Sequence, residues 1–220
     1  EMLGKTTGGM TILRRLREDP AGYPVYTVPE SLFKKICDTD TPQGIIAAVK
    51  KNENDPREII MHENAIFIIL DGTQDPGNAG TIIRTAHAAG AAAVFVSKGS
   101  VDVYGPKVLR STMGSIFAVP VYTGIDSSAA CELLKSKGAG IIVSCPDGES
   151  IYGVKRYRGP LALVVGNESA GVDRNLMEKA DFVVSIPMPG GTESLNASVA
   201  AGILLYELLE RRMEGRHHRI

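Results

Sequence analysis

The chain has 220 residues, of which 44% are hydrophobic and 22% charged, and its formal net charge is −1. These values exclude a disordered polypeptide and allow one large domain, or a large domain with a small partner. The near-neutral total charge gives no sign of a nucleic-acid or membrane partner, although a local basic surface is compatible with it. No apolar stretch of the sequence is long enough to span a bilayer.

Three cysteines are dispersed along the chain. Cys37, Cys131 and Cys145 are far apart and have no metal-ligand spacing. With no signal-peptide pattern in the sequence, they predict ordinary buried thiols in a reducing cytoplasm and no bound metal.

Residues 1–55 are predicted to form a small α/β unit. YPVYTV (23–28) and GIIAAVK (44–50) read as strands, and SLFKKICD (31–38) between them has the pattern of a short helix. A piece of this size is too short to be a comfortable independent domain. It is followed by KKNENDPRE (50–58), a polar, proline-bearing segment that is typical of a linker.

Beyond the linker, short apolar segments alternate with helical patterns. Near-continuous apolar strands are typical of a mostly parallel sheet, and strand–helix alternation places helices on both of its faces. The predicted strands are AIFIIL (65–70), AAVFVS (92–97), IFAVPVY (116–122), GIIVSC (140–145), LALVVG (161–166) and FVVSIP (182–187). The predicted helices are GTIIRTAHAAG (80–90), KVLRSTMGS (107–115), SSAACELLKSKG (127–138), DRNLMEKA (173–180) and a deeply packed final helix from Leu195 to Arg212.

Three polar, glycine-bearing loops follow strands of the predicted sheet. They are DGTQDPGNAGTIIRTA (71–86), GNESAGVD (166–173) and PMPGGTESLN (187–196). Their carboxamides and carboxylates are unusual for plain turns. Because ligands of such sheets bind outside the carboxyl ends of the strands, these loops are predicted to line one pocket.

Each loop also has a purely structural interpretation. Asp75 or Asn78 would simply cap the helix that follows. Ser194 or Asn196 would do the same for the final helix, and a glutamate in a turn, such as Glu168, is more often solvated than catalytic. The polar residues of TESLN nevertheless exceed what one helix cap requires, which favours a pocket.

The polar loops also carry a family resemblance. DPGNAGTIIRTA, LVVGNESAGV and IPMPGGTESLNASVAAGILLYEL resemble, in order and spacing, the three motifs of the SpoU (TrmH-type) RNA ribose 2′-O-methyltransferases of the SPOUT superfamily. The resemblance implies a methyltransferase domain over residues 60–214, followed by a basic tail at 215–220. TPQGIIAAV resembles the closing strand of the ribosomal-protein-like RNA-binding domain that often precedes it, here expected in shortened form over residues 1–55.

The same resemblance implies a C-terminal deep trefoil knot, a homodimer, and S-adenosylmethionine as methyl donor with S-adenosylhomocysteine as product. Main-chain groups of the three loops, marked by Gly166, Ile186 and Leu195, would hold the cofactor. Val165 and Met188 would form its walls. A core role for Ile186 and Leu195 is compatible with this, because it is their main-chain groups that would bind.

The resemblance points to Arg84 as the central catalytic residue. Because an arginine side chain stays protonated in proteins, we favour an electrostatic clamp on the ribose oxygen and the adjacent phosphate, and a role as base stays open. Asn78 and Asn196 would orient Arg84 or the ribose. Glu168 would hold the guanidinium, and Ser194 would hydrogen-bond within the same pocket. No metal is needed for the transfer.

Other candidates are secondary. His87 is an alternative base, but a histidine on a helix face is more often structural. Arg110 and Ser111 either face RNA or belong to a helix that packs on the sheet.

The predicted function is methyl transfer to a ribose 2′-hydroxyl of structured RNA, with 23S ribosomal RNA favoured by the extra N-terminal piece. The alternatives are the same reaction on transfer RNA and a catalytically silent RNA-binding protein of the same fold. A generic nucleotide-binding enzyme is disfavoured, because the sequence has no phosphate-loop or dinucleotide signature.

Overall fold

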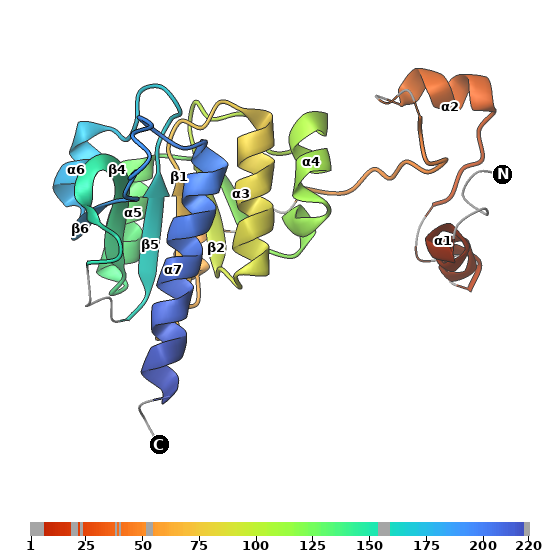
Figure 1. Ribbon diagram of the computed structural model, residues 1–220. Coiled ribbons are helices and arrows are strands. Elements are labelled where there is room, and N and C mark those ends of the chain that lie inside the picture. The colour runs from red at the N-terminus through yellow and green to blue at the C-terminus, as the bar shows by residue number, and fades with distance from the viewer. Residues whose placement is uncertain are drawn as a thin grey trace. The chain divides into compact units, whose positions relative to one another are not determined.

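The computed structural model (Figure 1) describes residues 7–18, 22, 24–37, 39, 41–51, 55–153 and 159–217, with the backbone alone for 211–217. The chain divides into two compact units, Glu1–Asn52 and Glu53–Ile220. None of the helices in the described part of the chain is long and apolar enough to cross a membrane.

The N-terminal unit contains two helices, α1 (Thr7–Glu18) and α2 (Glu30–Ile36). Helix α2 confirms the helix expected over 31–38 and ends at the half-buried Cys37. Sequence reasoning missed α1. The available signal was the spacing of the half-buried Leu13 and Leu16, three residues apart and therefore on one helical face.

The strands predicted at 23–28 and 44–50 are wrong for the described residues of both segments, which form no strand. Val25, Tyr26 and Val49 are 59%, 83% and 64% exposed, so these segments do not bury an apolar face. Two strands without a third strand or a packed helix are marginal in water. In its described residues, the expected small α/β unit therefore contains helices and irregular segments but no strand.

The C-terminal unit is built on a six-stranded parallel sheet in the order β3-β2-β1-β5-β4-β6, which confirms the mostly parallel α/β class. The strands are β1 (Ile66–Leu70), β2 (Ala93–Ser97), β3 (Val121–Ile125), β4 (Gly140–Ser150), β5 (Leu161–Val165) and β6 (Phe182–Ser185). The neighbours β1 and β5 continue toward opposite edges of the sheet. Their carboxyl ends therefore form the switch point at which α/β sheets bind ligands.

Two strands differ from their predicted bounds by more than two residues. A short 3₁₀ helix, η3 (Ser115–Phe117), occupies the start of the strand predicted at 116–122. Pro120 has no N–H to donate to a neighbouring strand, so β3 begins after it. Strand β4 is longer than predicted because its second half also pairs with β6.

Helices cover both faces of the sheet (Figure 1), as the alternation of strands and helices predicted. Helices α3 (Pro76–Ala88), α4 (Pro106–Thr112) and α7 (Ala197–His217) lie on one face, and α5 (Ser127–Ser136) and α6 (Arg174–Lys179) on the other. Alternate residues of each strand supply the two cores. In β1, Ile68 packs with the first group of helices and Phe67 with the second.

The final helix differs from its predicted span. It begins at Ala197, two residues later than expected, because Asn196 caps it from outside the helix. It runs beyond the expected end at Arg212, so residues 215–217 of the expected tail are helical. Residues 218–220 lie outside the described residues.

Candidate active site

Three loops meet at the carboxyl edge of the sheet and are joined by side-chain hydrogen bonds. The Nδ2 of Asn78, in the first turn of α3 after β1, donates to Oε1 of Glu168, which follows β5, at 3.0 Å. The Nδ2 of Asn196, which follows β6, donates to Oδ1 of Asn78 at 2.9 Å. The paired residues are 90 and 118 positions apart in the sequence. The fold thus brings three of the predicted site residues into one network, Glu168–Asn78–Asn196.

The carboxylate of Glu168 sets the direction of each bond in this network. Because an ionised carboxylate only accepts, Asn78 must turn its amide nitrogen toward Glu168 and its oxygen toward Asn196. The nitrogen of Asn196 is then committed, and its oxygen accepts from the main-chain N–H groups of Ser198 and Val199 at 3.0 and 3.3 Å. Asn196 therefore caps α7 with one end of its carboxamide and joins the loops with the other.

Hydrogen bonds keep Glu168 ionised. Partial burial raises its pKa, but hydrogen bonds from the Asn78 side chain and from the main-chain N–H groups of Glu168, Gln74 and Asp75 outweigh burial and lower the pKa. The Gln74 N–H lies 3.3 Å from Oε2. Since Glu168 is a carboxylate at neutral pH, the direction of the network is maintained. Asp75, for its part, caps α3, accepting from the Asn78 N–H at 2.7 Å.

Sequence reasoning missed Asn167, which fixes the loop that carries Glu168. Its Nδ2 donates to the carbonyl of Gly72 at 2.7 Å and thereby ties this loop to the one after β1. Its Oδ1 accepts from the N–H groups of Ser169 and Ala170, both at 2.9 Å. All of its side-chain polar atoms are used within the protein, so Asn167 positions Glu168 rather than offering groups to a ligand.

Two further polar side chains that sequence reasoning missed hold the loop after β1. The Gln74 side chain donates to the carbonyl of Gly99, and the Ser97 hydroxyl accepts from the N–H of Gly72 at 2.8 Å. The only sequence signal was their position, with Gln74 in the polar loop after β1 and Ser97 as the last residue of β2. These bonds tie the loop to the carboxyl end of β2.

Arg84 lies on α3 but outside the network. It is six positions from Asn78 along the helix, which directs the two side chains about 120° apart around the helix axis. The side chain of Arg84 is exposed and makes no hydrogen bond or ion pair with any residue that the structure describes. Within the chain, the expectation that Glu168 holds its guanidinium is not met, because the Glu168 oxygens accept from Asn78 and Gln74.

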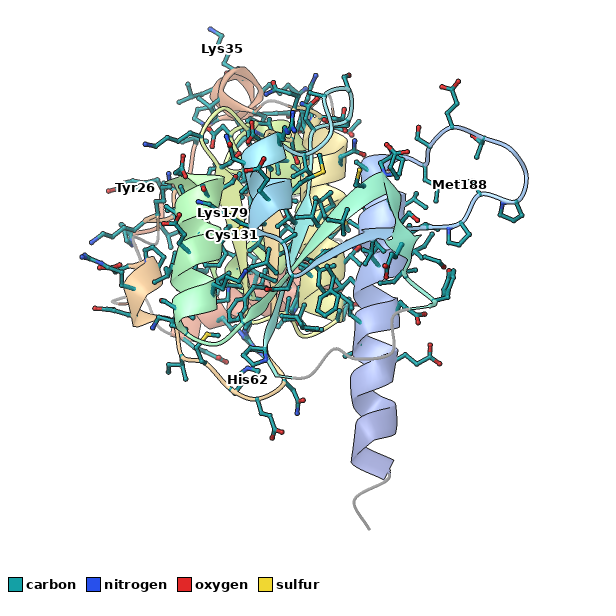
Figure 2. All side chains as sticks on the ribbon, turned by 90° about the vertical axis from the view of Figure 1, so that its left-hand side faces the viewer. Tyr26, Lys35, His62, Cys131, Lys179 and Met188 are labelled. Carbon is teal, nitrogen blue, oxygen red and sulfur yellow. The ribbon has the colours of Figure 1, made fainter. Side chains whose placement is uncertain are left out.

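The expected cofactor residues lie around the same edge. Val165 ends β5 and is buried in the core on the α3 and α7 side of the sheet. Gly166 follows it, and a Cβ there would collide with the main chain of Gly171, so the return of this loop requires glycine. Ile186 and Met188 are half-buried after β6, and Figure 2 shows Met188 on a loop that projects from the sheet.

Two expected site residues immediately precede Asn196. Leu195 is half-buried. Ser194 is exposed, and its main-chain carbonyl accepts from the Thr192 hydroxyl at 3.4 Å. Neither side chain joins the network.

The donor set at this edge fits S-adenosylmethionine. The main-chain groups of Gly166, Ile186 and Leu195 have no hydrogen-bond partner among the residues that the structure describes. All three residues are half-buried, and partly buried main-chain groups are costly unless water or a ligand pairs them. They offer N–H donors and carbonyl acceptors of the kind that adenine and ribose bind. In the described part of the chain, no three His, Cys, Asp or Glu residues are grouped to hold a metal.

Comparison with known proteins identifies the family. The model of the SpoU rRNA Methylase family matches residues 65–206, and a model of RNA 2′-O ribose methyltransferase substrate binding matches residues 5–55. The 23S rRNA (guanosine(2553)-2′-O)-methyltransferase RlmP of Bacillus subtilis is 40% identical over 187 residues, which cover 85% of this chain and 73% of RlmP. The 23S rRNA (guanosine-2′-O-)-methyltransferase RlmB of Haemophilus influenzae is 36% identical over 199 residues, covering 87% of this chain and 80% of RlmB.

Solved structures agree with the sequence relatives. The AdoMet-bound rRNA methyltransferase from Sinorhizobium meliloti superimposes with a TM-score of 0.83 at 29% identity, over 96% of this chain and 78% of that one. The SpoU methyltransferase AviRb from Streptomyces viridochromogenes, in complex with AdoMet, gives a TM-score of 0.79 at 29% identity, over 90% of this chain and 77% of that one. With more than half of its length matched by the family model, the chain belongs to the SpoU rRNA Methylase family.

Proposed function

We propose that this chain transfers a methyl group from S-adenosylmethionine to a ribose 2′-hydroxyl of 23S ribosomal RNA. The observation that carries the proposal is the Glu168–Asn78–Asn196 network, which joins three loops at the switch point of the sheet. Relatives of 36% and 40% identity are named as 23S rRNA 2′-O-methyltransferases, which supports this substrate. A ribosomal RNA substrate implies that the protein acts in the cytoplasm.

The cofactor would be held by the main-chain groups of Gly166, Ile186 and Leu195, with Val165 and Met188 as apolar walls. Bound S-adenosylmethionine supplies a methyl group that its positively charged sulfur already activates, and S-adenosylhomocysteine remains as product. Two similar solved structures contain AdoMet, which supports this assignment.

The protein must then align the hydroxyl with the methyl group and manage one proton. The carbon–sulfur bond breaks as the oxygen–carbon bond forms, and the hydroxyl proton leaves. Arg84 is exposed and without a partner in the described residues, so its guanidinium is available to bind an RNA phosphate and to stabilise the charge that develops on the 2′-oxygen. The adjacent phosphate accepts the proton. A role of Arg84 as base would need a neutral guanidinium, whereas an arginine side chain stays protonated in proteins.

The other site residues act around this step. Asn78 and Asn196 hold the three loops in register and so position the groups that surround the ribose. Glu168 fixes the direction of their hydrogen bonds through its negative charge. The exposed hydroxyl of Ser194 hydrogen-bonds the sugar or its phosphate.

Residues 1–55 would bind the RNA substrate, as the match to a substrate-binding model suggests. The described helix α1 supports this, because Arg14, Arg15 and Arg17 are all exposed on it. Changing the three arginines to glutamate should weaken binding of 23S rRNA transcripts, and unchanged binding would contradict this role. The same chemistry on transfer RNA is the second candidate, and the test below distinguishes the two.

We also expect a homodimer. Val199 and Tyr206 are 50% and 48% exposed on α7, with the half-buried Ile203 between them. Their spacing places all three on one apolar stripe that the described residues of the C-terminal unit leave partly exposed. Sedimentation equilibrium should give a dimer that Tyr206→Glu dissociates, and a monomeric wild type would contradict the expectation.

The threading of the C-terminal part supports the expected trefoil knot. Strand β6 lies at the edge of the sheet, yet α7, which follows it, packs against α3 near the centre. The pairing of β4 with β6 continues past the end of β4, where the Ile151 N–H donates to the carbonyl of Ser185 at 2.9 Å. An experimental structure that traces the chain from β4 to α7 would test the knot.

The function is tested by methyl transfer from tritiated S-adenosylmethionine to unmodified 23S rRNA and to transfer RNA. Arg84→Ala should abolish transfer to 23S rRNA while leaving S-adenosylhomocysteine binding, measured by calorimetry, within about twofold. Arg84→Lys keeps the positive charge but cannot form two parallel hydrogen bonds to a phosphate. It should therefore show only part of the activity that Arg84→Ala loses. Loss of cofactor binding together with transfer would instead assign Arg84 a structural role. A wild type that binds no S-adenosylhomocysteine would favour a silent RNA-binding protein.

A further inference from the structure

One segment of the C-terminal unit is basic although the whole chain is not. Residues 76–125 contain four basic residues and one acidic residue, Asp102, a net charge of +3 in a chain whose formal charge is −1. The basic residues are Arg84, Lys98, Lys107 and Arg110, and all four are exposed. The positive charge is therefore concentrated on α3, α4 and the end of β2, where it attracts phosphate.

Arg84 emerges at the seam between α3 and α4. On α3, Gly80, Arg84 and His87 follow each other at intervals of four and three residues and so lie on one face. Gly80 contacts α4, because a Cβ added to it would meet Ser111, and His87 Nδ1 lies 3.1 Å from the hydroxyl of Ser115. Arg84 lies between these two contacts on the same face.

The turn that connects α4 to η3 places two large apolar side chains in water beside this seam. Met113 is 72% exposed and Phe117 is 73% exposed. Ser115, which contacts His87, is two residues from each of them. We call residues 113–117 the Met113–Phe117 turn.

Met113 also has an unfavourable backbone conformation. With φ at 49° and ψ at 40° it is left-handed, and it is the only non-glycine residue with positive φ in the described chain. Glycine would adopt this helix-ending conformation without strain. A methionine there weakens the fold and exposes apolar surface, so an unbound protein gains nothing from it. Such strain is expected where a side chain serves binding.

We propose that the Met113–Phe117 turn is a stacking platform for an unpaired nucleobase of the substrate RNA. The base lies on the ring of Phe117 with the Met113 side chain against its edge, while Arg84, Lys107 and Arg110 bind the flanking phosphates. Exposed aromatic rings beside basic side chains are the usual means of binding single-stranded RNA. This inference rests on the proposed function and adds the surface that selects an unstacked nucleotide next to Arg84.

A second copy of the chain is the alternative occupant of this surface. A two-fold contact centred on this surface would bring the basic patches of the two copies, each with Arg84, Lys107 and Arg110, close together. Like charges in such a contact are repulsive, whereas the phosphates of RNA complement them. The charge thus favours RNA on the Met113–Phe117 turn.

The test compares Phe117→Ala, Phe117→Trp and Tyr152→Ala on full-length protein with unmodified 23S rRNA transcript as the probe. Phe117→Ala should raise the KM for RNA roughly tenfold, at the lower end of the loss expected for one stacked base. Phe117→Trp should restore it, because the larger ring stacks at least as well. Tyr152 is an aromatic residue in the turn after β4, 54% exposed, and its replacement should leave the KM unchanged. S-adenosylhomocysteine binding should be the same in all variants.

Met113→Gly gives a second, independent readout. Removing the left-handed methionine should raise Tm by about 2–4 °C, while removing its side chain should raise the KM for RNA. A rise in Tm with an unchanged KM would overturn the role of Met113, because the strain would then serve no binding.

The outcomes separate this inference from the proposed function. If the wild type methylates 23S rRNA and Phe117→Ala does so with an unchanged KM, the platform is wrong and the function stands. If Phe117→Ala dissociates a dimer without changing RNA binding, the turn contacts a second copy and the inference is overturned. If the wild type transfers no methyl group, the function is wrong, and RNA binding that depends on Phe117 would still support the platform.

Discussion

Replacing Asn78 with aspartate tests the network most sharply, because the change is nearly isosteric. An aspartate at this position keeps the oxygen that accepts from Asn196 but places a second carboxylate where the nitrogen now donates to Glu168 at 3.0 Å. Two unit charges about 4 Å apart repel by about 1 kcal/mol in water and about 4 kcal/mol at an effective dielectric constant of 20. Glu168 is exposed, which favours the lower part of this range, but Asn78 is buried, so the repulsion exceeds the value in water. Adding the lost charged hydrogen bond gives a destabilisation of about 3 kcal/mol.

Urea unfolding followed by circular dichroism at pH 7 measures this loss, with Asn175→Asp as a control. Asn175 is an exposed asparagine on α6, and its change adds the same charge away from the network. Adding Glu168→Gln to Asn78→Asp should recover much of the stability, because the new amide can donate to the aspartate. A double variant no more stable than Asn78→Asp, or an Asn78→Asp protein as stable as the control, would refute the proposed direction of the bonds.

The pH dependence of Asn78→Asp follows from the same pair. Two adjacent carboxylates raise each other's pKa in the folded state, so protonation relieves the repulsion. The destabilisation should therefore be complete at pH 7 and shrink as pH falls toward about 4. In the wild type the pKa of Glu168 is lowered, so the stability that its ionised form contributes is present at neutral pH and is lost only below the ordinary glutamate value of about 4.3.

Three further substitutions or modifications have defined outcomes. Thr73 is buried, and its hydroxyl has no partner in the described structure. Thr73→Val should therefore stabilise the protein by about 1 kcal/mol in urea unfolding, and a loss of stability would reveal a partner for the hydroxyl. Burial raises the pKa of Cys131 to about 11, so at pH 8 about one Cys131 thiol in a thousand is ionised. Alkylation should therefore label the half-buried Cys145 before Cys131, and equal rates for both thiols would contradict the burial. In Gly80→Ala, the new Cβ would lie 2.9 Å from the carbonyl of Val108, so α3 and α4 must separate. The protein should lose about 1–3 kcal/mol of stability, and unchanged stability would refute the close approach of the two helices.

The sheet was predictable from the sequence where a strand is apolar throughout. Both β1 and β5 are fully buried runs of β-branched and other apolar residues, and each was predicted to within one residue. The start of β3 was not predictable in this way. The apolar pattern continues through Phe117, and only the missing N–H of Pro120 makes the strand begin later. The N-terminal strands failed because apolar content at Val25 and Tyr26 does not say what would cover those side chains.

The site was predictable as a meeting of loops but not as a set of bonds. Polar residues after parallel strands had to lie at one edge, which placed Asn78, Glu168 and Asn196 together. Glu168 binds Asn78 and leaves Arg84 exposed. This choice depends on the rotation of α3 against α7, and tertiary packing sets that rotation. The reach of Asn167 to the neighbouring loop likewise depends on the pairing of β1 with β5, since that pairing sets the two loops side by side.

Ribose mapping of the methylated RNA tests the account most directly. Unmodified 23S rRNA is incubated with tritiated S-adenosylmethionine and the full chain, digested to nucleosides, and the labelled nucleoside is identified by mass spectrometry. We predict label on one 2′-O-methylated nucleoside with the wild type and none with Arg84→Ala. Label on a base instead of a ribose, or undiminished label with Arg84→Ala, would contradict the account.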